Sequence, residues 1–372
     1  MFASALGIRL VLWMGKSVPL PATPELLAAL VRAEATSDAD GSSGFQLTFS
    51  LSKDQGMDYG LLRESALEPF SRVILGVIMG AVPEVLADGV ITHHELTPGI
   101  EPGSSTLTVT GRDLTVMMDL EEKNEKYENQ PDSLIVTRIL AAYGQYGIVP
   151  GPTPTTDIPL LIDRIPRQHE TDLQFIQRLA KKNGFVFYIE PVAFGVNFAF
   201  WGPETRAGVP QPALSAGSGP DANVKSLSFS NDGLAPVGTE GVFVDPFLKM
   251  AIPIPSLPSL RIPPLSGSPS SARRKKLLRS TANQNAGQAA TTAVAEVSNT
   301  ADPVRGEGTL DAVRYGAVLR PRKLVGLCGA GQNYDGNYYV RRVKHSIQRG
   351  EYTQQFTLSR EGTGTLIPVV LR

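Results

Sequence analysis

The chain has 372 residues, a formal net charge of −1, and 42% hydrophobic against 19% charged residues. This composition is that of a globular protein of two or three domains, and it excludes a disordered or fibrous chain. The near balance of charge excludes a general electrostatic attraction to nucleic acid or to an anionic membrane, although local basic clusters are compatible with it. The single cysteine, Cys328, excludes an intrachain disulfide framework and a cysteine-rich zinc site.

Residues 1–22 lack the positively charged start of a signal peptide, and Arg9 and Lys16 interrupt their apolar character. An early strand fits this stretch better. No segment reaches the roughly 18 uninterrupted apolar residues that a membrane-spanning helix needs. The sequence therefore predicts a soluble protein without stable membrane insertion.

A first β-rich domain is predicted over residues 1–115. Residues 45–52 alternate between apolar and polar side chains, which is typical of a half-buried strand. Residues 72–80 are more uniformly apolar, as in a strand covered on both faces. Residues 89–96 and 105–113 complete a series of short strands separated by glycine and proline, which favours a sandwich or barrel.

The pattern changes after Asp113, and an α/β insert is predicted over residues 116–202. Asp113 is expected to cap a helical segment that becomes very polar. A second helix is expected to begin near Asp132. A third is clearer, because Thr171 is placed as its N-cap, an apolar stripe follows, and Gly184 ends it. Two aromatic-rich strands that form a hairpin complete the insert.

A second β-rich domain is predicted after a linker at residues 203–223. It begins at residues 224–251, is interrupted at residues 252–304, and resumes at residues 305–372. The interruption consists of a proline-rich arm, which has too many prolines for a helix or a central strand, and an alanine-rich helix. The arm needs another surface to bury its apolar side chains. The arm residues expected to make those contacts are Ile252, Ile254, Leu257, Leu260 and Ile262.

Two clusters contain residue types that occur in catalytic or metal sites. His93 and His94 are adjacent on a predicted strand and point to opposite faces, so they do not share a metal readily. Glu121, Glu122 and Glu125 lie in a run interleaved with lysine, which is typical of a solvated helix face and not of paired catalytic acids. Neither cluster predicts a catalytic residue, a metal or a cofactor.

Two further motifs carry weaker signals. The glycines within residues 326–336 are not followed by a helix, so phosphate binding is unsupported. The basic run "ARRKKLLR" at residues 272–279 has two interpretations. It contacts phosphate or an acidic partner, or it is the charged start of a helix, and the second interpretation is favoured.

The segment from Gly336 to Gly362 is predicted to be a hairpin with one apolar and one polar face. His345 lies on the apolar face, where its ring packs and its nitrogens bond neighbouring groups, so it is interpreted as a structural histidine. Arg349 and Gly350 form the turn. The polar face of the return strand, expected to line a channel, consists of Thr353, Gln355, Thr357 and Ser359.

The segment "RQHETDLQFIQRLAKKNGFVFYIE" resembles the central signature of the phage late-control D proteins and of the hub half of VgrG-type spikes. The matching positions are Thr171-Asp172-Leu173, Phe175, Arg178-Leu179, Gly184 and Phe185 to Tyr188. The segments "LTVTGRDLTVMMD" and "GNYYVRRVKHSIQRGEYTQQFTLSREG" resemble two more family motifs, in the same order. The resemblance covers about residues 20–362. Arg322 departs from it, because many relatives turn on glycine there.

The resemblance implies a baseplate hub of a contractile phage tail or a phage-like injection system. Such a hub is a homotrimer in which each chain supplies two similar β-barrel domains that flank a smaller α/β domain. The six barrels then adapt a sixfold tail tube or tube initiator above to a threefold spike below. Other implied partners are baseplate wedge or LysM-type neighbours, with no sequence-specific nucleic acid and no cofactor. The hub is assembled in the bacterial cytoplasm and becomes part of the virion tail or injection particle.

Two alternative functions belong to other classes of protein. A baseplate-associated cell-wall hydrolase would need a pair of carboxylates in a cleft. A glycan-binding module would need exposed aromatic side chains, but Trp13 and Trp201 both lie in apolar strand patterns that predict core positions.

Because the sequence ends at Arg372, soon after the closing hairpin, the spike is expected to be a separate protein.

Overall fold

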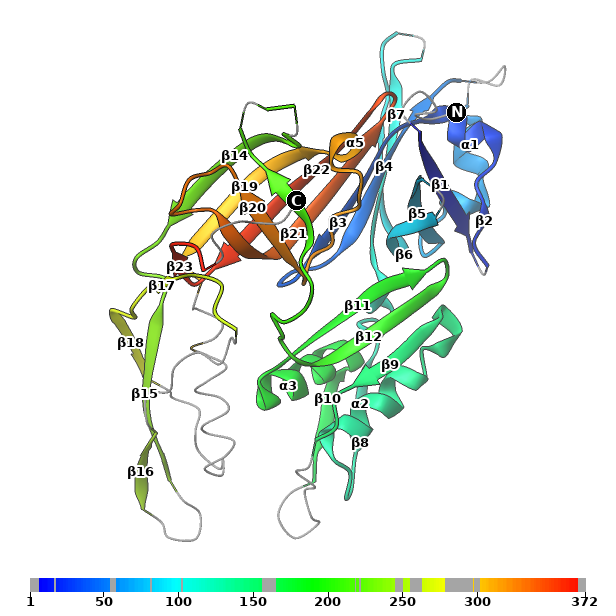
Figure 1. Cartoon of the computed structure of the whole chain (residues 1–372). Coiled ribbons are helices and arrows are strands. Elements are labelled where there is room, and N and C mark those ends of the chain that lie inside the picture. The colour runs from blue at the N-terminus through cyan, green and yellow to red at the C-terminus, as the bar shows by residue number, and fades with distance from the viewer. Residues whose placement is uncertain are drawn as a thin grey trace.

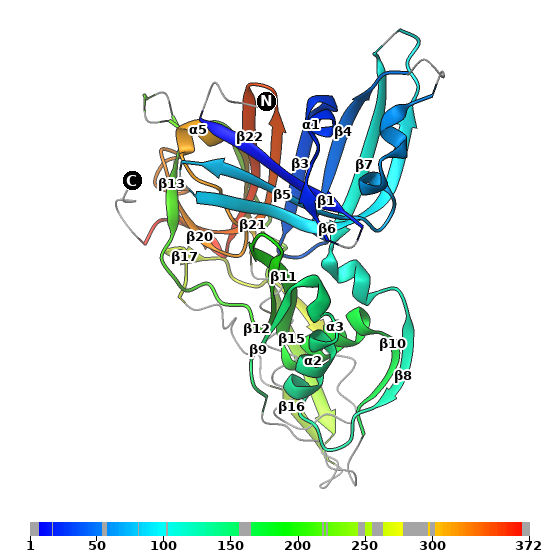
Figure 2. The ribbon, with the colours of Figure 1, turned by 90° about the vertical axis from the view of Figure 1, so that its right-hand side faces the viewer.

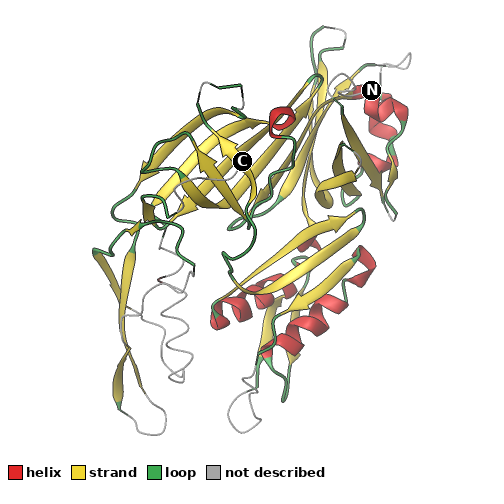
Figure 3. Ribbon diagram, viewed as in Figure 1, coloured by secondary structure: helices red, strands yellow, loops and turns green. Residues whose placement is uncertain are grey.

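The protein is described here by a computed structural model of the whole chain. The structure describes residues 7–366 apart from residues 17, 54–57, 81, 102, 156–164, 218, 221, 245–249, 255–262, 278–296 and 298–301. Strands dominate the molecule, and most of the helical residues gather in one part of it (Figure 3). The mainly β prediction is confirmed.

The first part of the chain forms seven strands, which we call the first β block. Their bounds are β1 (Ile8–Gly15), β2 (Leu20–Pro21), β3 (Leu30–Asp38), β4 (Gly44–Leu51), β5 (Arg72–Met79), β6 (Val82–Thr97) and β7 (Ser105–Asp113). Short helices connect them: α1 (Pro24–Ala29) and the 3-10 turns η2 (Gly60–Arg63) and η3 (Ser65–Leu67). In β4 the alternating apolar side chains are all buried, as the sequence predicts. In β5 the consecutive residues from Val73 to Val77 are all buried, because both faces of this part of the strand are covered.

The later part of the chain forms the second β block. Its elements are β13 (Gln211–Ser215), β14 (Val224–Asn231), β19 (Val304–Asp311), α5 (Ala312–Tyr315), β20 (Leu324–Cys328), β21 (Gly336–Gln348) and β22 (Glu351–Arg360). β13 lies within the predicted linker and pairs parallel with β20, so this stretch contains a strand of the block. The predicted closing hairpin is confirmed as β21 and β22, which turn at Arg349 and Gly350.

The two β blocks form one continuous sheet. Thirteen strands belong to it, and the main path runs β14-β19-β22-β21-β3-β4-β7-β6-β5-β1-β2. The blocks meet where β21 pairs antiparallel with β3, with His345 opposite Ala35. A single apolar core runs through both blocks. Among the described strands, no pairing closes either block on itself, so the structure shows a large, mainly antiparallel sheet and does not show the two β-barrels predicted.

The α/β insert lies below the first block (Figure 1). Its elements are η4 (Leu114–Met118), β8 (Glu122–Lys126), α2 (Asp132–Ala141), η5 (Gly144–Tyr146), β9 (Ile148–Pro152), β10 (Arg167–Thr171), α3 (Asp172–Asn183), β11 (Phe185–Ala193) and β12 (Val196–Pro203). α2 and α3 lie on one side of the β11-β12-β9 sheet (Figure 2). Trp201 and Phe175 are fully buried in the apolar core between these helices and the sheet.

The caps of α3 agree with the prediction. The Thr171 hydroxyl accepts a hydrogen bond from the Gln174 N–H at 3.3 Å, and Gly184 ends the helix in the left-handed conformation with φ of 66°.

The helix predicted after Asp113 is wrong beyond its first turn. Asp113 caps only η4, and residues Glu122–Lys126 form β8 because they pair with β10 through the full length of both strands.

A long excursion separates β14 from β19, although these strands are antiparallel neighbours with Asn231 opposite Val304. It contains β15 (Val237–Val244), β16 (Ala251–Ile254), β17 (Ser268–Pro269) and β18 (Arg274–Leu277). We call the three strands β16-β15-β18 the arm sheet, which projects beside the insert (Figure 1). β17 returns to the body, where it pairs with β23 (Gly362–Thr363).

Only part of the predicted arm and helix can be compared with the structure. Ile252 and Ile254 lie in β16, which pairs only with β15 among the described strands, as expected where Pro253 provides no N–H. Leu257, Leu260, Ile262 and nearly all of the predicted alanine-rich helix fall outside the described residues. The basic start of that helix is wrong, because Arg274–Leu277 form β18, parallel to β15.

Candidate functional site

The histidines predicted to be unsuited to metal binding lie on β6. His93 is opposite Thr110 and His94 is opposite Val109 on β7, so the two rings occupy successive positions of one strand. Within the described ranges, no group of three His, Cys, Asp or Glu residues is placed to hold a metal ion. Glu122 and Glu125 are exposed on β8. None of the helices that the structure describes has the length and apolar character needed to cross a membrane.

His345 is part of the scaffold, as the sequence predicts. It is 2% exposed, and its Nδ1 lies 2.9 Å from the hydroxyl oxygen of Tyr352 on the paired strand. Burial, with a smaller contribution from the charge of Arg320, lowers the pKa of His345 to about 3. The ring is therefore neutral at pH 7 and holds a side-chain partner instead of the backbone groups expected.

The four residues predicted to line a channel differ in exposure. Gln355 is exposed, and Thr353 and Thr357 are half-buried. Ser359 is fully buried: its hydroxyl donates to Asp302 Oδ2 at 2.8 Å and accepts from Arg341 Nε at 3.0 Å. Ser359 therefore belongs to a buried polar cluster, and its assignment to the channel face is corrected. The β-bulge in β21 between Val340 and Arg342 shifts the pairing near this end of β22.

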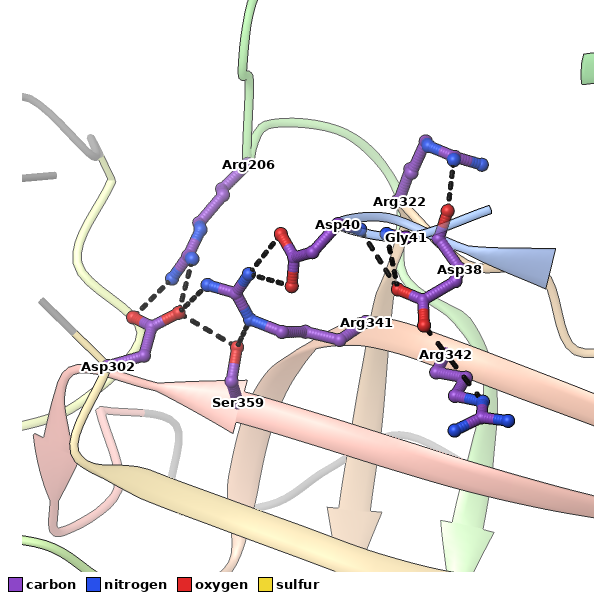
Figure 4. Close-up of polar contacts among 9 residues, drawn as sticks. All are labelled: Asp38, Asp40, Gly41, Arg206, Asp302, Arg322, Arg341, Arg342 and Ser359. Atoms are coloured by element: carbon purple, nitrogen blue, oxygen red, sulfur yellow. Dashed lines mark hydrogen bonds and ion pairs between the residues drawn. The ribbon is translucent and has the colours of Figure 1, made fainter. Parts of the chain in front are cut away.

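That cluster is a set of linked polar side chains, buried around Asp302 and exposed at Asp40 (Figure 4). We call it the Asp302 cluster, and its members are Arg206, Asp302, Arg341, Asp40 and Ser359. Arg206 Nη1 donates to Asp302 Oδ1 at 2.9 Å, and Arg341 Nη2 donates to Asp302 Oδ2 at 2.8 Å. Arg341 Nη1 also donates to both carboxylate oxygens of Asp40, at 2.7 and 2.6 Å.

The Asp302 cluster joins segments that are far apart in the sequence. Arg206 follows the insert, Asp302 ends the arm excursion, Arg341 lies on β21, and Asp40 lies in the turn between β3 and β4. The side chains of Arg206 and Asp302 are 1% and 4% exposed. Burial alone would lower the pKa of Arg341, but the carboxylates of Asp302 and Asp40 raise it above its ordinary value. Such a cluster is satisfied only when all four segments are in place.

A second polar contact fastens the insert to the body. The Arg322 guanidinium lies 4.0 Å from the centroid of the Tyr188 ring on β11, and its Nη2 donates to the carbonyl oxygen of Asp38. Arg322 has φ of 63°, a left-handed backbone conformation in which glycine is favoured. The Arg322 side chain therefore links Tyr188 of the insert to Asp38 of β3, which a glycine at this position could not do.

The hairpin of the insert also docks on β1 and β5. The Phe194 ring, at the β11–β12 turn, lies 5.2 Å from the Trp13 ring, and a Cβ on Gly76 would come within 2.7 Å of Phe194 Cζ. Nearby, Asn197 Nδ2 donates to Asp88 Oδ2 at 2.8 Å. Trp201 is buried as predicted, while Trp13 is half-buried against the insert.

A small cavity of about 20 Å³ lies at this contact between the insert and the first block. Asp88, Asp113 and Asn197 are among the residues that line it. Its volume suits one water molecule. The contact between insert and body is therefore polar as well as aromatic.

Solved structures with the same fold were found, while sequence comparisons found no counterpart. No family model matches the chain, and no curated protein matches its sequence. A tail protein from Neisseria meningitidis MC58 aligns with a TM-score of 0.65 and 15% identity over 96% of this chain and 98% of that chain. The 43 kDa tail protein of prophage MuSo2 from Shewanella oneidensis aligns with a TM-score of 0.65 and 15% identity, over 95% and 98%.

A third structure comes from a secretion system. An Escherichia coli protein, described as a type VI secretion component similar to bacteriophage T4 tail proteins, aligns with a TM-score of 0.56 and 14% identity. That alignment covers 91% of this chain and 77% of that chain. The chain therefore has, over nearly its whole length, the fold of these tail and secretion-system proteins.

The sequence did not reveal the residues that hold the segments together. Asp40, Arg206, Asp302 and Arg341 have no common spacing, and Arg341 lies on a strand whereas the other three lie outside strands. Only Arg322 had a signal, because a basic residue at a glycine-like turn requires a compensating contact. Long-range ion pairs of this kind become visible only when the strand pairing is known.

Proposed function

We propose that this chain is the structural hub of a contractile phage tail or of a phage-like injection system. The observation that carries the proposal is the fold shared with tail proteins over 95–96% of this chain and 98% of theirs. On this proposal the protein has no catalytic role. It is assembled in the bacterial cytoplasm and becomes part of the tail baseplate.

We propose further that three copies form a ring in which each chain supplies two comparable β blocks. Both blocks run outward from the β3–β21 pair as antiparallel strands. In both, a strand ends at an aspartate that caps a short helix: Asp113 accepts from Thr115 N–H, and Asp311 accepts from Val313 N–H. This repeated detail supports a sixfold arrangement made from three chains, which would match a sixfold tube to a threefold spike.

The polar face of the sheet supports a channel that both blocks line. The strand registers place Thr110, Gln46 and Glu34 in one row across β7, β4 and β3. The row continues to Ser346 on β21 and Thr353 on β22. The opposite face of these strands holds the core, so only this face is available to moving cargo. Thr353, Gln355 and Thr357 keep their proposed place on it.

The proposed neighbours are a tail tube or tube initiator above the ring, a spike below it, and baseplate wedge or LysM-type proteins around it. Cryo-electron microscopy of the purified chain, and of particles that contain it, tests the proposal. We expect a trimer whose six β blocks surround a channel with polar walls. A monomeric chain inside its particle, or two blocks that face different environments, would contradict it. Clearing of peptidoglycan by the purified protein would instead support the hydrolase alternative.

A further inference from the structure

The first strand of interest is β18, the outer strand of the arm sheet. It pairs with β15 on one side and with no other described strand. Arg274, Lys275 and Lys276 on β18 are exposed, as is Arg273 just before it. An outer strand presents N–H and C=O groups that pair readily with another strand. β18 therefore combines a pairing edge with three positive charges, and Arg273 adds a fourth next to it.

The second strand is β8, at the edge of the insert. It pairs only with β10 among the described strands. Residues 121–128 contain four glutamates and two lysines, a net charge of −2, and all four glutamates are exposed. Lys123 Nζ already lies 2.6 Å from Asp172 Oδ2, so its charge is neutralised within the insert. β8 itself holds two glutamates and two lysines, and the flanking Glu121 and Glu128 give the stretch along this edge its net negative charge.

The two edges face different parts of the surface: the arm sheet lies beside the insert in Figure 1, and β8 lies at the outer edge of the insert in Figure 2. In Figure 1 the arm sheet and β8 are separated by α3 and β10. Two different surfaces that complement each other join copies head to tail, and such contacts close into a ring when the rotation allows it. Pairing of β18 with its own β8 is not what the structure shows, because each strand pairs with a different neighbour.

We propose that β18 of one copy docks on β8 of a second copy of this chain, as an added strand held in place by opposite charges. The proposal rests on the proposed function, because it specifies one contact between the subunits of the ring. Backbone hydrogen bonds of the added strand provide binding, while Glu121, Glu122, Glu125 and Glu128 select a basic partner strand. The contact lies in the insert and the arm, away from the large sheet.

Cysteine cross-linking tests the contact directly. Facing residues on paired strands have Cβ atoms about 4.5–5.5 Å apart, close to the separation that a disulfide needs. In a Cys328→Ser background, Arg274→Cys is combined in turn with Glu122→Cys, Asn124→Cys or Lys126→Cys, so that the unknown register does not matter. At least one combination should give disulfide-linked chains up to a closed trimer under mild oxidation.

Charge reversal provides an independent test. Arg273→Glu with Arg274→Glu should weaken association about tenfold, and adding Glu121→Lys with Glu122→Lys in the same chain should restore it. The control is Arg305→Glu with Lys181→Glu, which makes the same change in net charge at exposed positions outside both edges. This control should leave association unchanged. Raising the salt from about 0.05 M to about 0.5 M should weaken the unmodified contact, because the Debye length shortens.

The outcomes separate this proposal from the proposed function. Trimers that never cross-link, and whose association ignores the charge reversal, would overturn the β18–β8 contact and leave the hub proposal standing. Disulfides formed only within one chain would overturn the contact too. A chain that stays monomeric at every concentration and does not cross-link would overturn both proposals.

Discussion

Two joints of the molecule are built differently: one connects the two β blocks, and the other connects the insert to them. The joint between the β blocks combines the β3–β21 backbone ladder with the buried Asp302 cluster. The joint between the insert and the β blocks rests on side chains: Phe194 and Asn197 contact the first block, and Arg322 of the second block contacts Tyr188. Damage to the first joint should therefore destabilise the whole sheet, whereas damage to the second should loosen the insert alone.

The largest effect is expected at the Asp302 cluster. Asp302→Ala leaves the guanidinium groups of Arg206 and Arg341 without their shared buried carboxylate, which should cost about 3–5 kcal/mol of unfolding free energy. Urea unfolding measures this loss. Asp40→Ala is the matched control, because the Asp40 side chain binds the same Arg341 but is 60% exposed. Its cost should stay below about 1 kcal/mol. Equal losses in the two variants would contradict the importance of burial.

The second effect concerns pH and the ladder between the blocks. His345 lies in this ladder opposite Ala35, and its pKa is lowered to about 3 by burial. In the unfolded chain it takes up a proton near pH 6.5. The folded state excludes that proton, so stability is complete above about pH 6.5 and falls as the pH drops toward about 3, by about 1.4 kcal/mol per pH unit.

The change that isolates this dependence is His345→Gln, which removes the titrating group. We expect a flatter profile of unfolding free energy between about pH 6 and pH 4 than in the unmodified protein, measured by urea unfolding at each pH. His169→Gln serves as the control, because His169 is exposed on β10. If the two variants kept the same slope as the unmodified chain, His345 would not be the group that excludes the proton.

The third effect should be confined to the insert. Phe194→Ala removes the ring that packs on Trp13 and fills the space above Gly76, which should cost about 1–3 kcal/mol. We expect faster hydrogen exchange of the backbone amides in β11 and β12, with little change in β3 and β21. Val192→Ala is the control on the same hairpin, because Val192 is 61% exposed. Faster exchange throughout the sheet would show that the two joints are not independent.

The sequence predicted the elements better than it predicted the joints. Strand alternation in β4, the cap of α3 at Thr171 and the closing hairpin around Gly350 follow from local patterns, and the structure confirms them. β8 was missed because a run of glutamate and lysine suits a helix locally, and only pairing with β10 makes it a strand. The Asp302 cluster depends on four distant segments, so no local pattern encodes it.

The smallest effect on stability is expected at Arg322, where two variants can be compared directly. Arg322→Ala removes the contacts with Tyr188 and Asp38 while a Cβ stays in the left-handed backbone, so it should cost about 1–2 kcal/mol. Arg322→Gly removes the same contacts but also relieves the strain of the left-handed backbone, which raises the unfolding free energy by about 1 kcal/mol relative to alanine. Glycine should therefore be nearly neutral for stability measured by urea unfolding, although both variants should increase hydrogen exchange in β11 equally. If alanine and glycine had the same stability, the backbone at residue 322 would not be strained. If neither variant changed the exchange in β11, the Arg322–Tyr188 contact would not hold the insert, and the joint would depend on Phe194 and Asn197.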